Sequence, residues 1–340
     1  TGSPRDLPSF PPRRASDVPQ GSVLLRRFTE TPISAGSIAQ VHRALTAEGD
    51  AVAVKVRRPN IEQTLRTECE ILTSVAGLIR AAISDQNTFD PRRMVAEFTE
   101  AVQREVDLTN ELRNLQRFAR NFADDPTVHV PAAYPRYCAR GVLTMEYIDG
   151  IKPTRGEALR AAGLDPGLIA QRGADFILRQ VFDFGVFHTD PHPGNLLILG
   201  GDVVTPLDFG QVARLSRTSR NLTAELVPAI VDKDAERMVH AFAAEDLLPP
   251  QTDTGAMEQD VEELLEVYHS LPVREIPFGR MMSQTFDIIR RHHVRPPPEF
   301  TMMLKSIMTI ESLARSLSPD FQLIEQLRPY ARRLSVEQFS

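Results

Sequence analysis

The first part of the chain opens with short apolar runs that predict β-strands. Residues 38–44 and 51–56 are rich in β-branched side chains, and Glu48-Gly49-Asp50 between them suits a hairpin turn. The small-residue segment Ser34-Ala35-Gly36-Ser37 precedes the first of these runs. Because small side chains let a backbone approach a ligand closely, this segment is a candidate phosphate-binding loop.

From residue 61 onward the apolar positions recur every three or four residues, which is the period of an amphipathic helix. One helix is predicted over residues 61–83. A second begins at Asp90-Pro91, an N-cap followed by proline at the first helical position, and runs to about residue 122. The apolar stripe of the first helix comprises Leu65, Cys69, Leu72, Val75, Ala76, Leu78 and Ile79, and the expected buried side of the second comprises Met94, Val95, Phe98, Val102, Val106, Leu112, Leu115 and Phe118.

Two further strands are predicted before the pattern becomes mainly helical. They cover residues 128–131 and 141–147, and the second ends in Met145-Glu146-Tyr147. This end is predicted to be a hinge between two lobes, so the backbone of Glu146 and Tyr147 is a candidate for binding an adenine ring. A boundary follows at residues 150–154, and a helix opens at Asp165-Pro166. Helical spacing then recurs near residues 216–231, 234–246, 256–270, 276–293, 297–316 and 321–338.

Composition narrows the class of protein. The 340 residues carry a formal net charge of −6, so nothing suggests a nucleic-acid partner. The two cysteines, Cys69 and Cys138, favour packing roles and a reducing compartment over a disulfide framework. No apolar run reaches the ~18 residues of a membrane span. Residues 1–21 are rich in Pro, Arg and Ser and predict an irregular arm. We expect a cytoplasmic protein, with a peripheral location at the membrane left open.

Residues 188–210 carry the pattern that is most informative about chemistry. Asp190 and Asn195 are separated by four residues in His188-Thr189-Asp190-Pro191-His192-Pro193-Gly194-Asn195, and Asp208-Phe209-Gly210 follows after an apolar run. This is the layout of a kinase catalytic loop and its metal-binding D-F-G. Phosphoryl transfer needs a carboxylate near the nucleophile and oxygen donors that hold magnesium against the phosphates. Asp190 is therefore predicted to be the catalytic base, and Asn195 and Asp208 the magnesium ligands.

Lys55 ends a strand that reads V-A-V-K, which in kinases supplies the lysine that pairs with the α and β phosphates. Taken alone, Lys55 would be a solvated lysine, and Asp190 and Asn195 could merely close a turn. A zinc or iron site at His188, Asp190 and His192 is a further alternative. It is disfavoured because two prolines restrict this backbone and no other His or Cys cluster lies nearby.

The partner of Lys55 is open from spacing alone. Generic kinase logic places a glutamate on the first long helix, which nominates Glu68 or Glu70. The second helix offers Glu105 and Glu111, although acids on a helix are usually its solvated face.

Taken together, these motifs resemble the UbiB-type (aarF domain-containing) family of atypical kinases. The segments that carry the resemblance are residues 32–44, 52–59, 105–107, 187–195 and 207–210, and it extends over roughly residues 22–335. The resemblance implies that Glu111 is the partner of Lys55, and that Glu105 and Asp107 form the family's E-x-D motif. It also implies ATP or ADP binding with Mg²⁺, ATPase-like activity, a link to quinone or isoprenoid-lipid metabolism, and contact with a membrane surface.

Two departures from the family pattern concern its regulation. The inhibitory K-x-G-Q segment has no counterpart in these residues, so it either lies upstream or is lacking. The third alanine of the family's alanine-rich loop is Gly36 here. Glycine is freer to adopt phosphate-cradling geometry, which leaves the nucleotide preference open.

The sequence thus predicts an α+β, two-lobed protein-kinase-like fold. A small mixed lobe with an antiparallel sheet and added long helices is expected over residues 22–148, and a larger, mainly helical lobe over 149–340. The predicted function is transfer or hydrolysis of the γ-phosphate, with an unknown acceptor. Two alternatives stay open: a nucleotide-gated module that binds lipids or partners with little catalysis, and a small-molecule phosphotransferase of the aminoglycoside or choline kinase kind.

Overall fold

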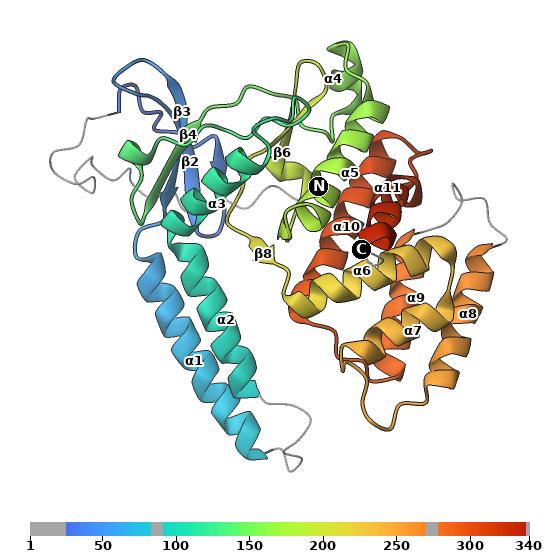
Figure 1. Cartoon of the computed structure of the whole chain (residues 1–340). Helices are drawn as coiled ribbons and strands as arrows, with labels where there is room; N and C mark the ends of the chain where they lie inside the picture. The colour runs from blue at the N-terminus through green and yellow to red at the C-terminus, as the bar shows by residue number, and fades with distance from the viewer. Residues whose placement is uncertain (1–24, 83–90, 270–277, 338–340) are drawn as a thin grey trace, which may run out of the picture. The chain divides into compact units, whose positions relative to one another are not determined.

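The computed structural model of the chain describes residues 25–82, 91–269 and 278–337 (Figure 1). The chain forms two compact units. Unit 1 comprises the described residues up to Gln116 together with Pro131–Ile148, and unit 2 comprises Arg117–Val130 together with the described residues from Asp149 onward. The predicted irregular arm at residues 1–21 lies outside the described residues.

Unit 1 contains a four-stranded antiparallel sheet in the order β1-β2-β3-β4. Its strands are β1 (Ser34–Ala35), β2 (Ala39–Leu45), β3 (Ala51–Arg57) and β4 (Val142–Glu146). Val52 and Val54 of β3 are buried on one face of the sheet. Because side chains alternate along a strand, Lys55 points to the opposite face. The turn between β2 and β3 contains Gly49 at φ 105°, a conformation that favours glycine.

Three helices follow β3 in unit 1: α1 (Ile61–Ala82), α2 (Pro91–Val106) and α3 (Leu108–Asn121), the last of which continues into unit 2. The prediction of one helix from residue 90 to about 122 was wrong, because the helix breaks at Asp107. The Asp107 Oδ1 accepts hydrogen bonds from the backbone N–H of Thr109 at 3.0 Å and from its hydroxyl at 2.7 Å. An aspartate that binds the N–H two residues on is a typical N-cap, so Asp107 starts a new helix.

Helices α1 and α2 lie side by side as a hairpin that extends away from the sheet of unit 1 (Figure 1). Cys69 and Ala76 of α1 are buried, but much of the apolar stripe is exposed. Met94 and Phe98, which were expected on the buried side, are 55% and 52% exposed, because a two-helix hairpin buries only the positions along its contact line. The large exposed apolar side chains of the hairpin are Ile71, Leu72, Val75, Leu78, Ile79, Met94 and Phe98.

Unit 2 is built around α5 (Pro166–Phe182), which packs against α10 (Pro298–Leu317). Asp165 caps α5 by accepting from the backbone N–H groups of Gly167 and Leu168, as its Asp-Pro start predicts. Two small antiparallel ribbons complete the core. The pairs are β5 (Val186–His188) with β8 (Val212–Arg214), and β6 (Leu196–Leu199) with β7 (Val203–Pro206).

The remaining helices of unit 2 are α4 (Gly156–Ala161), α6 (Arg217–Asp232), α7 (Ala235–Ala244), α8 (Thr254–His269), α9 (Phe278–Arg291) and α11 (Leu323–Glu337). With α10, the last five match the helical segments predicted after residue 216. The short helix α4 was not predicted. In the part of the chain that the structure describes, no helix combines the length and the apolar character needed to cross a membrane.

Candidate functional site

Lys55 and Glu111 form a close ion pair within unit 1. The Lys55 Nζ donates to both carboxylate oxygens of Glu111, each at 2.8 Å. The side chains are 20% and 4% exposed, respectively. A buried carboxylate is costly unless a cation and hydrogen bonds compensate it, and this bidentate contact supplies both. The pair fixes the Lys55 ammonium in position on the sheet face opposite the buried valines.

The other glutamates that spacing nominated for Lys55 lie elsewhere. Glu68 and Glu70 are exposed on α1, and Glu70 contacts Arg66 at 3.4 Å on the same helix. Glu105 is exposed near the end of α2. The structure therefore brings Lys55 together with the glutamate that the family resemblance implied, 56 residues away in the sequence.

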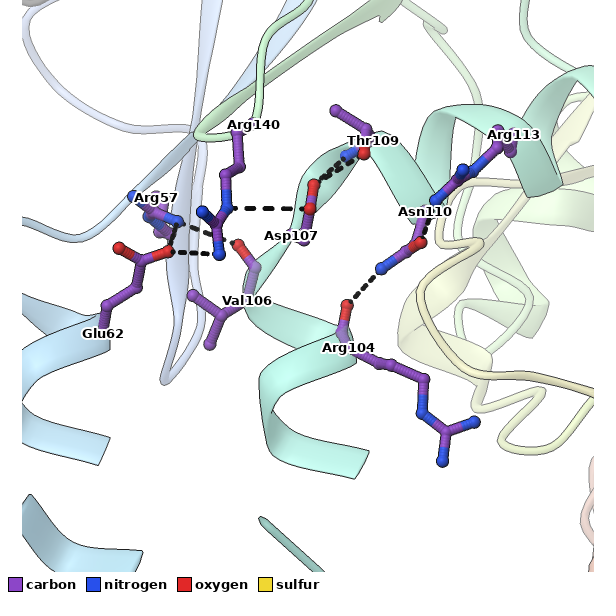
Figure 2. A network of polar contacts seen from close by, with 9 residues as sticks. All are labelled: Arg57, Glu62, Arg104, Val106, Asp107, Thr109, Asn110, Arg113 and Arg140. Carbon is purple, nitrogen blue, oxygen red and sulfur yellow. Dashed lines mark hydrogen bonds and ion pairs between the residues drawn. The ribbon is translucent and has the colours of Figure 1, made fainter. Parts of the chain in front are cut away.

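A network of charged side chains holds the start of α3, the helix that carries Glu111 (Figure 2). Arg57, two residues after Lys55 on β3, donates to Glu62 at 2.7 Å and to the backbone carbonyl of Val106 at 3.3 Å. Arg140 lies 3.2 Å from the same Glu62 carboxylate and 3.6 Å from the Asp107 carboxylate. The strand that presents the lysine and the helix that presents its partner are thus tied to each other.

The pKa of Asp107 at the centre of this network lies below its ordinary value. Partial burial alone would raise the pKa of this carboxyl, but hydrogen bonds from Thr109 and the positive charge of Arg140 outweigh it. Beside it, the Asn110 side chain donates to the carbonyl of Arg104 at 2.9 Å (Figure 2). Asp107 is therefore a junction residue, although a carboxylate in this pattern could equally have belonged to a solvated helix face.

The small-residue segment at residues 34–37 is exposed and closed by backbone contacts. The N–H of Gly36 donates to the carbonyl of Ala39 at 2.9 Å. Arg58 contacts the segment through its guanidinium Nε, which donates to the carbonyl of Gly36 at 3.0 Å. Its backbone N–H donates to the carbonyl of Ile38, just after the segment, at 2.8 Å. Arg58, which follows β3, was not among the predicted site residues.

Gly36 does not use the conformational freedom that we expected of it. Its φ lies outside the left-handed region, and an added Cβ would meet only the Ala39 carbonyl at 3.7 Å, an ordinary contact. An alanine would fit at this position. The substitution of the family's alanine by Gly36 is therefore not required by the backbone geometry of this loop.

At the predicted hinge, the backbone N–H groups are engaged within unit 1. The backbone N–H of Glu146 donates to the carbonyl of Ala132 at 2.8 Å, and the backbone N–H of Tyr147 donates to the carbonyl of Ala51 at 3.0 Å. The guanidinium of Arg43 lies 4.4 Å from the centre of the Tyr147 ring. Adenine recognition at Glu146 and Tyr147 would therefore rely on groups other than these two amides.

In unit 2, backbone turns shape the loop that carries Asp190. His188 at the end of β5 is buried, and its Nδ1 accepts from the N–H of Asp190 at 3.0 Å. The backbone N–H of His188 donates to the Oε1 atom of the buried Gln180 side chain at 2.9 Å. The N–H of His192 then donates to the carbonyl of Asp190 at 2.7 Å. These contacts hold the backbone on both sides of Asp190 and leave its half-exposed carboxylate outside the turn.

A β-hairpin brings the two predicted metal ligands close in register. Asn195 precedes β6 and Asp208 follows β7, which pair from Leu196↔Pro206 onward. The ladder continues by one bond, from the N–H of Leu207 to the carbonyl of Asn195 at 2.9 Å. Asn195 and Asp208 therefore both lie at the open end of this hairpin. One Asp208 oxygen accepts from the N–H of Gly210 at 2.9 Å.

Phe209 anchors the segment that follows Asp208. Its side chain is fully buried, and its ring packs edge-on against Phe118 of α3, with 5.3 Å between ring centres. The hydrophobic core of unit 2 thus fixes the residue next to Asp208, the predicted metal ligand. This is the arrangement that a D-F-G sequence predicts.

The donor set fits Mg²⁺ better than a transition metal. In the described parts of the chain, no group of three or more His, Cys, Asp or Glu side chains could hold a metal ion. The Nδ1 atoms of His188 and His192 both accept backbone N–H groups, so these rings serve the loop. An amide and a carboxylate, from Asn195 and Asp208, suit a Mg²⁺ ion that takes its other ligands from phosphates and water.

Two residues of α10 contact the loop and were missed from the sequence. Ser306 donates its hydroxyl to the carbonyl of His188 at 2.7 Å, 118 residues away along the chain. The Nζ of Lys305 lies 3.9 Å from an oxygen of Asp190. No local sequence pattern predicts these two contacts, because both residues lie on an ordinary amphipathic helix.

Comparison with known protein families identifies the chain at this point. The ABC1 atypical kinase-like domain matches residues 20–242, and the UbiB helical domain matches residues 261–322. The chain belongs to the ABC1/UbiB family of atypical kinase-like proteins. The family model spans both the Lys55–Glu111 pair and the residue 188–210 loop. The UbiB helical domain includes α10, which carries Lys305 and Ser306.

Similar members of the family include two named kinases. The chloroplastic protein ACTIVITY OF BC1 COMPLEX KINASE 1 of Arabidopsis thaliana is 32% identical over 97% of this chain and 49% of its own length. A probable protein kinase UbiB of Marinobacter nauticus is 29% identical over 95% of this chain and 61% of its own. The chain therefore spans about half to three-fifths of the length of these relatives.

A solved structure shares the fold. The complex of Rv3197 with erythromycin from Mycobacterium tuberculosis aligns with a TM-score of 0.61 and 20% identity, over 85% of this chain and 73% of that one. The α+β, protein-kinase-like fold expected from the sequence is confirmed, with an antiparallel amino-terminal sheet and a helical carboxy-terminal part.

Proposed function

We propose that this family member binds ATP or ADP with Mg²⁺ and transfers or hydrolyses the γ-phosphate. The observation that carries the proposal is the bidentate Lys55–Glu111 pair, with both N–H···O contacts at 2.8 Å. A lysine held in this way is what protein kinases use to position the α and β phosphates.

Each predicted residue then has a role in the proposed reaction. Lys55 holds the phosphates, and Glu111 orients Lys55. Asp190 accepts the proton of the attacking hydroxyl or water, and Asn195 and Asp208 would hold the metal. When bound, Mg²⁺ would neutralise part of the phosphate charge. Residues 34–37, clamped by Arg58, would cover the phosphates with backbone N–H groups.

We further propose that the acceptor is linked to quinone or isoprenoid-lipid metabolism and is met at a membrane surface. The family name shared with UbiB supports the link to quinone or isoprenoid-lipid metabolism. The exposed apolar side chains of the α1–α2 hairpin support contact with a membrane surface, since such a concentration of apolar side chains is uncommon on a surface that meets only water. In this proposal the protein works from the cytoplasmic side as a peripheral protein.

Thermal-shift titration with ATP, ADP and GTP, each with and without Mg²⁺, tests the nucleotide site directly. Wild-type protein should be stabilised by ATP and ADP, and more strongly with Mg²⁺, because a ligand that binds only the folded state raises its stability. Asp208→Asn should remove most of the Mg²⁺-dependent stabilisation, because it takes away the charged member of the predicted ligand pair. Asp202→Asn, at the far turn of the same hairpin, is the matched control. Unchanged Mg²⁺-dependent binding in Asp208→Asn would refute the proposal.

A turnover assay separates this function from the alternatives. Phosphate release or transfer that rises with lipid vesicles would support the kinase or ATPase acting at a membrane. Nucleotide binding with no turnover, with or without vesicles, would favour a nucleotide-gated binding module. Turnover on soluble amino alcohols or aminoglycosides alone would favour the small-molecule phosphotransferase.

A further inference from the structure

The loop around Asp190 contains no permanently charged cation of its own. Residues 188–195 include no lysine or arginine. During phosphoryl transfer, negative charge on the oxygens of the transferred group must be stabilised, and lysine or arginine side chains commonly share this task with the metal. A protein that performs this chemistry with such a loop needs a cation from another element.

Helix α10 supplies a cation at this place within unit 2. The Lys305 Nζ lies 3.9 Å from an oxygen of Asp190, and their side chains are 67% and 38% exposed. The distance is too long for a strong hydrogen bond, so the ammonium keeps capacity for other acceptors. An exposed pair of this kind contributes little to stability, which argues against a purely structural role.

The neighbouring residue fixes α10 against the loop. Ser306 is fully buried, and its hydroxyl donates to the carbonyl of His188 at 2.7 Å. His188 in turn accepts the N–H of Asp190 through its Nδ1. The base of the lysine side chain is therefore anchored one residue from a buried contact, while its long flexible arm reaches the carboxylate. This arrangement places the charge without immobilising it.

We propose that Lys305 contacts the terminal phosphate of the bound nucleotide and stabilises it during transfer. The proposal rests on the proposed nucleotide function. In the step, the bond between the γ-phosphorus and the β–γ bridging oxygen breaks, and ADP leaves with the electron pair. A new bond forms to the acceptor oxygen, whose proton passes to Asp190. Lys305 keeps its protons throughout and balances the charge of the phosphoryl oxygens.

The main rival role for Lys305 is a lock that keeps Asp190 occupied. A lock predicts that removing the lysine speeds turnover and leaves the affinities for ATP and ADP alike. A phosphate contact predicts slower turnover and a selective loss of ATP affinity, because ADP lacks the γ-phosphate. The ratio of the two affinities distinguishes these roles without relying on activity.

The experiment measures the dissociation constants of ADP and of a non-hydrolysable ATP analogue, with Mg²⁺, by calorimetry. The variants are Lys305→Met, Lys305→Arg and the control Arg290→Met, which removes an exposed arginine paired with Asp287 at 2.8 Å on α9. Lys305→Met should weaken the ATP analogue by about tenfold and ADP by less than about twofold. Lys305→Arg should restore most of the difference, and Arg290→Met should change neither.

The possible results are distinct. Equal affinities in Lys305→Met and wild type, or an equal loss for both nucleotides, would overturn the assignment of Lys305 while the nucleotide site stands. Faster turnover in Lys305→Met would show that Lys305 keeps Asp190 occupied, and would overturn the phosphate contact. Failure of the wild-type protein to bind either nucleotide would overturn the proposed function and this inference together. The unfolding temperature of each variant should stay that of wild type, because Lys305 is exposed.

Discussion

The two groups of candidate site residues are held in place by different kinds of interaction. In unit 1, the Lys55–Glu111 pair depends on charged side chains, including the Arg57 and Arg140 network at the start of α3. In unit 2, the loop that carries Asp190 depends on backbone turns and on neutral buried donors such as Ser306. Salt screens exposed charges, whereas buried neutral hydrogen bonds respond little to it. The two groups should therefore differ in how mutation and salt affect them.

The largest expected effect is that of Glu111→Gln. The change leaves the one-fifth exposed Lys55 ammonium facing an amide in place of a carboxylate. Breaking a buried pair costs about 3–5 kcal/mol. Because Gln still offers one acceptor and Lys55 keeps some water contact, we expect unfolding free energy to fall by about 1–3 kcal/mol. Nucleotide affinity should fall by about tenfold or more, since the lysine loses its orientation. Urea denaturation and calorimetric titration measure the two effects.

Glu70→Gln is the matched control for this comparison. It makes the same chemical change in an exposed residue whose partner, Arg66, lies 3.4 Å away on the same helix. Such pairs contribute about 0.3–0.5 kcal/mol, so neither stability nor nucleotide binding should change appreciably. Equal behaviour of the two variants would show that the Lys55–Glu111 pair is no more than a surface ion pair.

The next effect in size tests the loop of unit 2. Ser306→Ala removes the donor to the His188 carbonyl, and both residues are buried. A buried carbonyl that loses its partner costs about 1–2 kcal/mol. The loss should be the same at low and high salt, because neither group is charged. Urea denaturation at low and high salt measures the loss of unfolding free energy in Ser306→Ala. Ser312→Ala, at an exposed position on the same helix, is the control. A loss that disappears at high salt would contradict the comparison.

How much of this could be predicted from the sequence depends on how local each signal is. The segment at residues 188–210 is continuous, so its spacing alone nominated Asn195 and Asp208 together, and the structure places them at the two ends of one hairpin. Their role as metal ligands stays a prediction. The strand that carries Lys55, β3, was also predicted from its local pattern. The identity of the partner of Lys55 was not, because spacing left glutamates on both predicted helices open, and only the family resemblance favoured Glu111.

Other features could not be read from the pattern for physical reasons. The break at Asp107 had a local signal, an aspartate two residues before a threonine, but a charged residue in a helical pattern is more often a solvated face. The exposure of Met94 and Phe98 had no local signal in the sequence. Periodicity shows that a helix has an apolar side, but it does not show what covers that side. Ser306 and Lys305 reach the loop only through the packing of α10.

The smallest expected effect separates the charged network from the backbone beneath it. Arg140→Ala removes two contacts, at 3.2 Å to Glu62 and 3.6 Å to Asp107, from a side chain that is 69% exposed. The Arg140 carbonyl still accepts the N–H of Leu108, so the first turn of α3 stays anchored. We expect a loss of about 0.5 kcal/mol at low salt and almost none at about 1 M salt.

Salt dependence is the decisive measurement for Arg140→Ala, made by denaturation at low and high ionic strength. Arg136→Ala serves as the control, since Arg136 lies 3.9 Å from Glu48, which belongs to the turn between β2 and β3. If Arg140→Ala costs as much at high salt as at low salt, the arginine acts through packing of its side chain and not through its charge. In that case the contrast between the charged anchoring in unit 1 and the neutral anchoring in unit 2 would reduce to the Lys55–Glu111 pair alone.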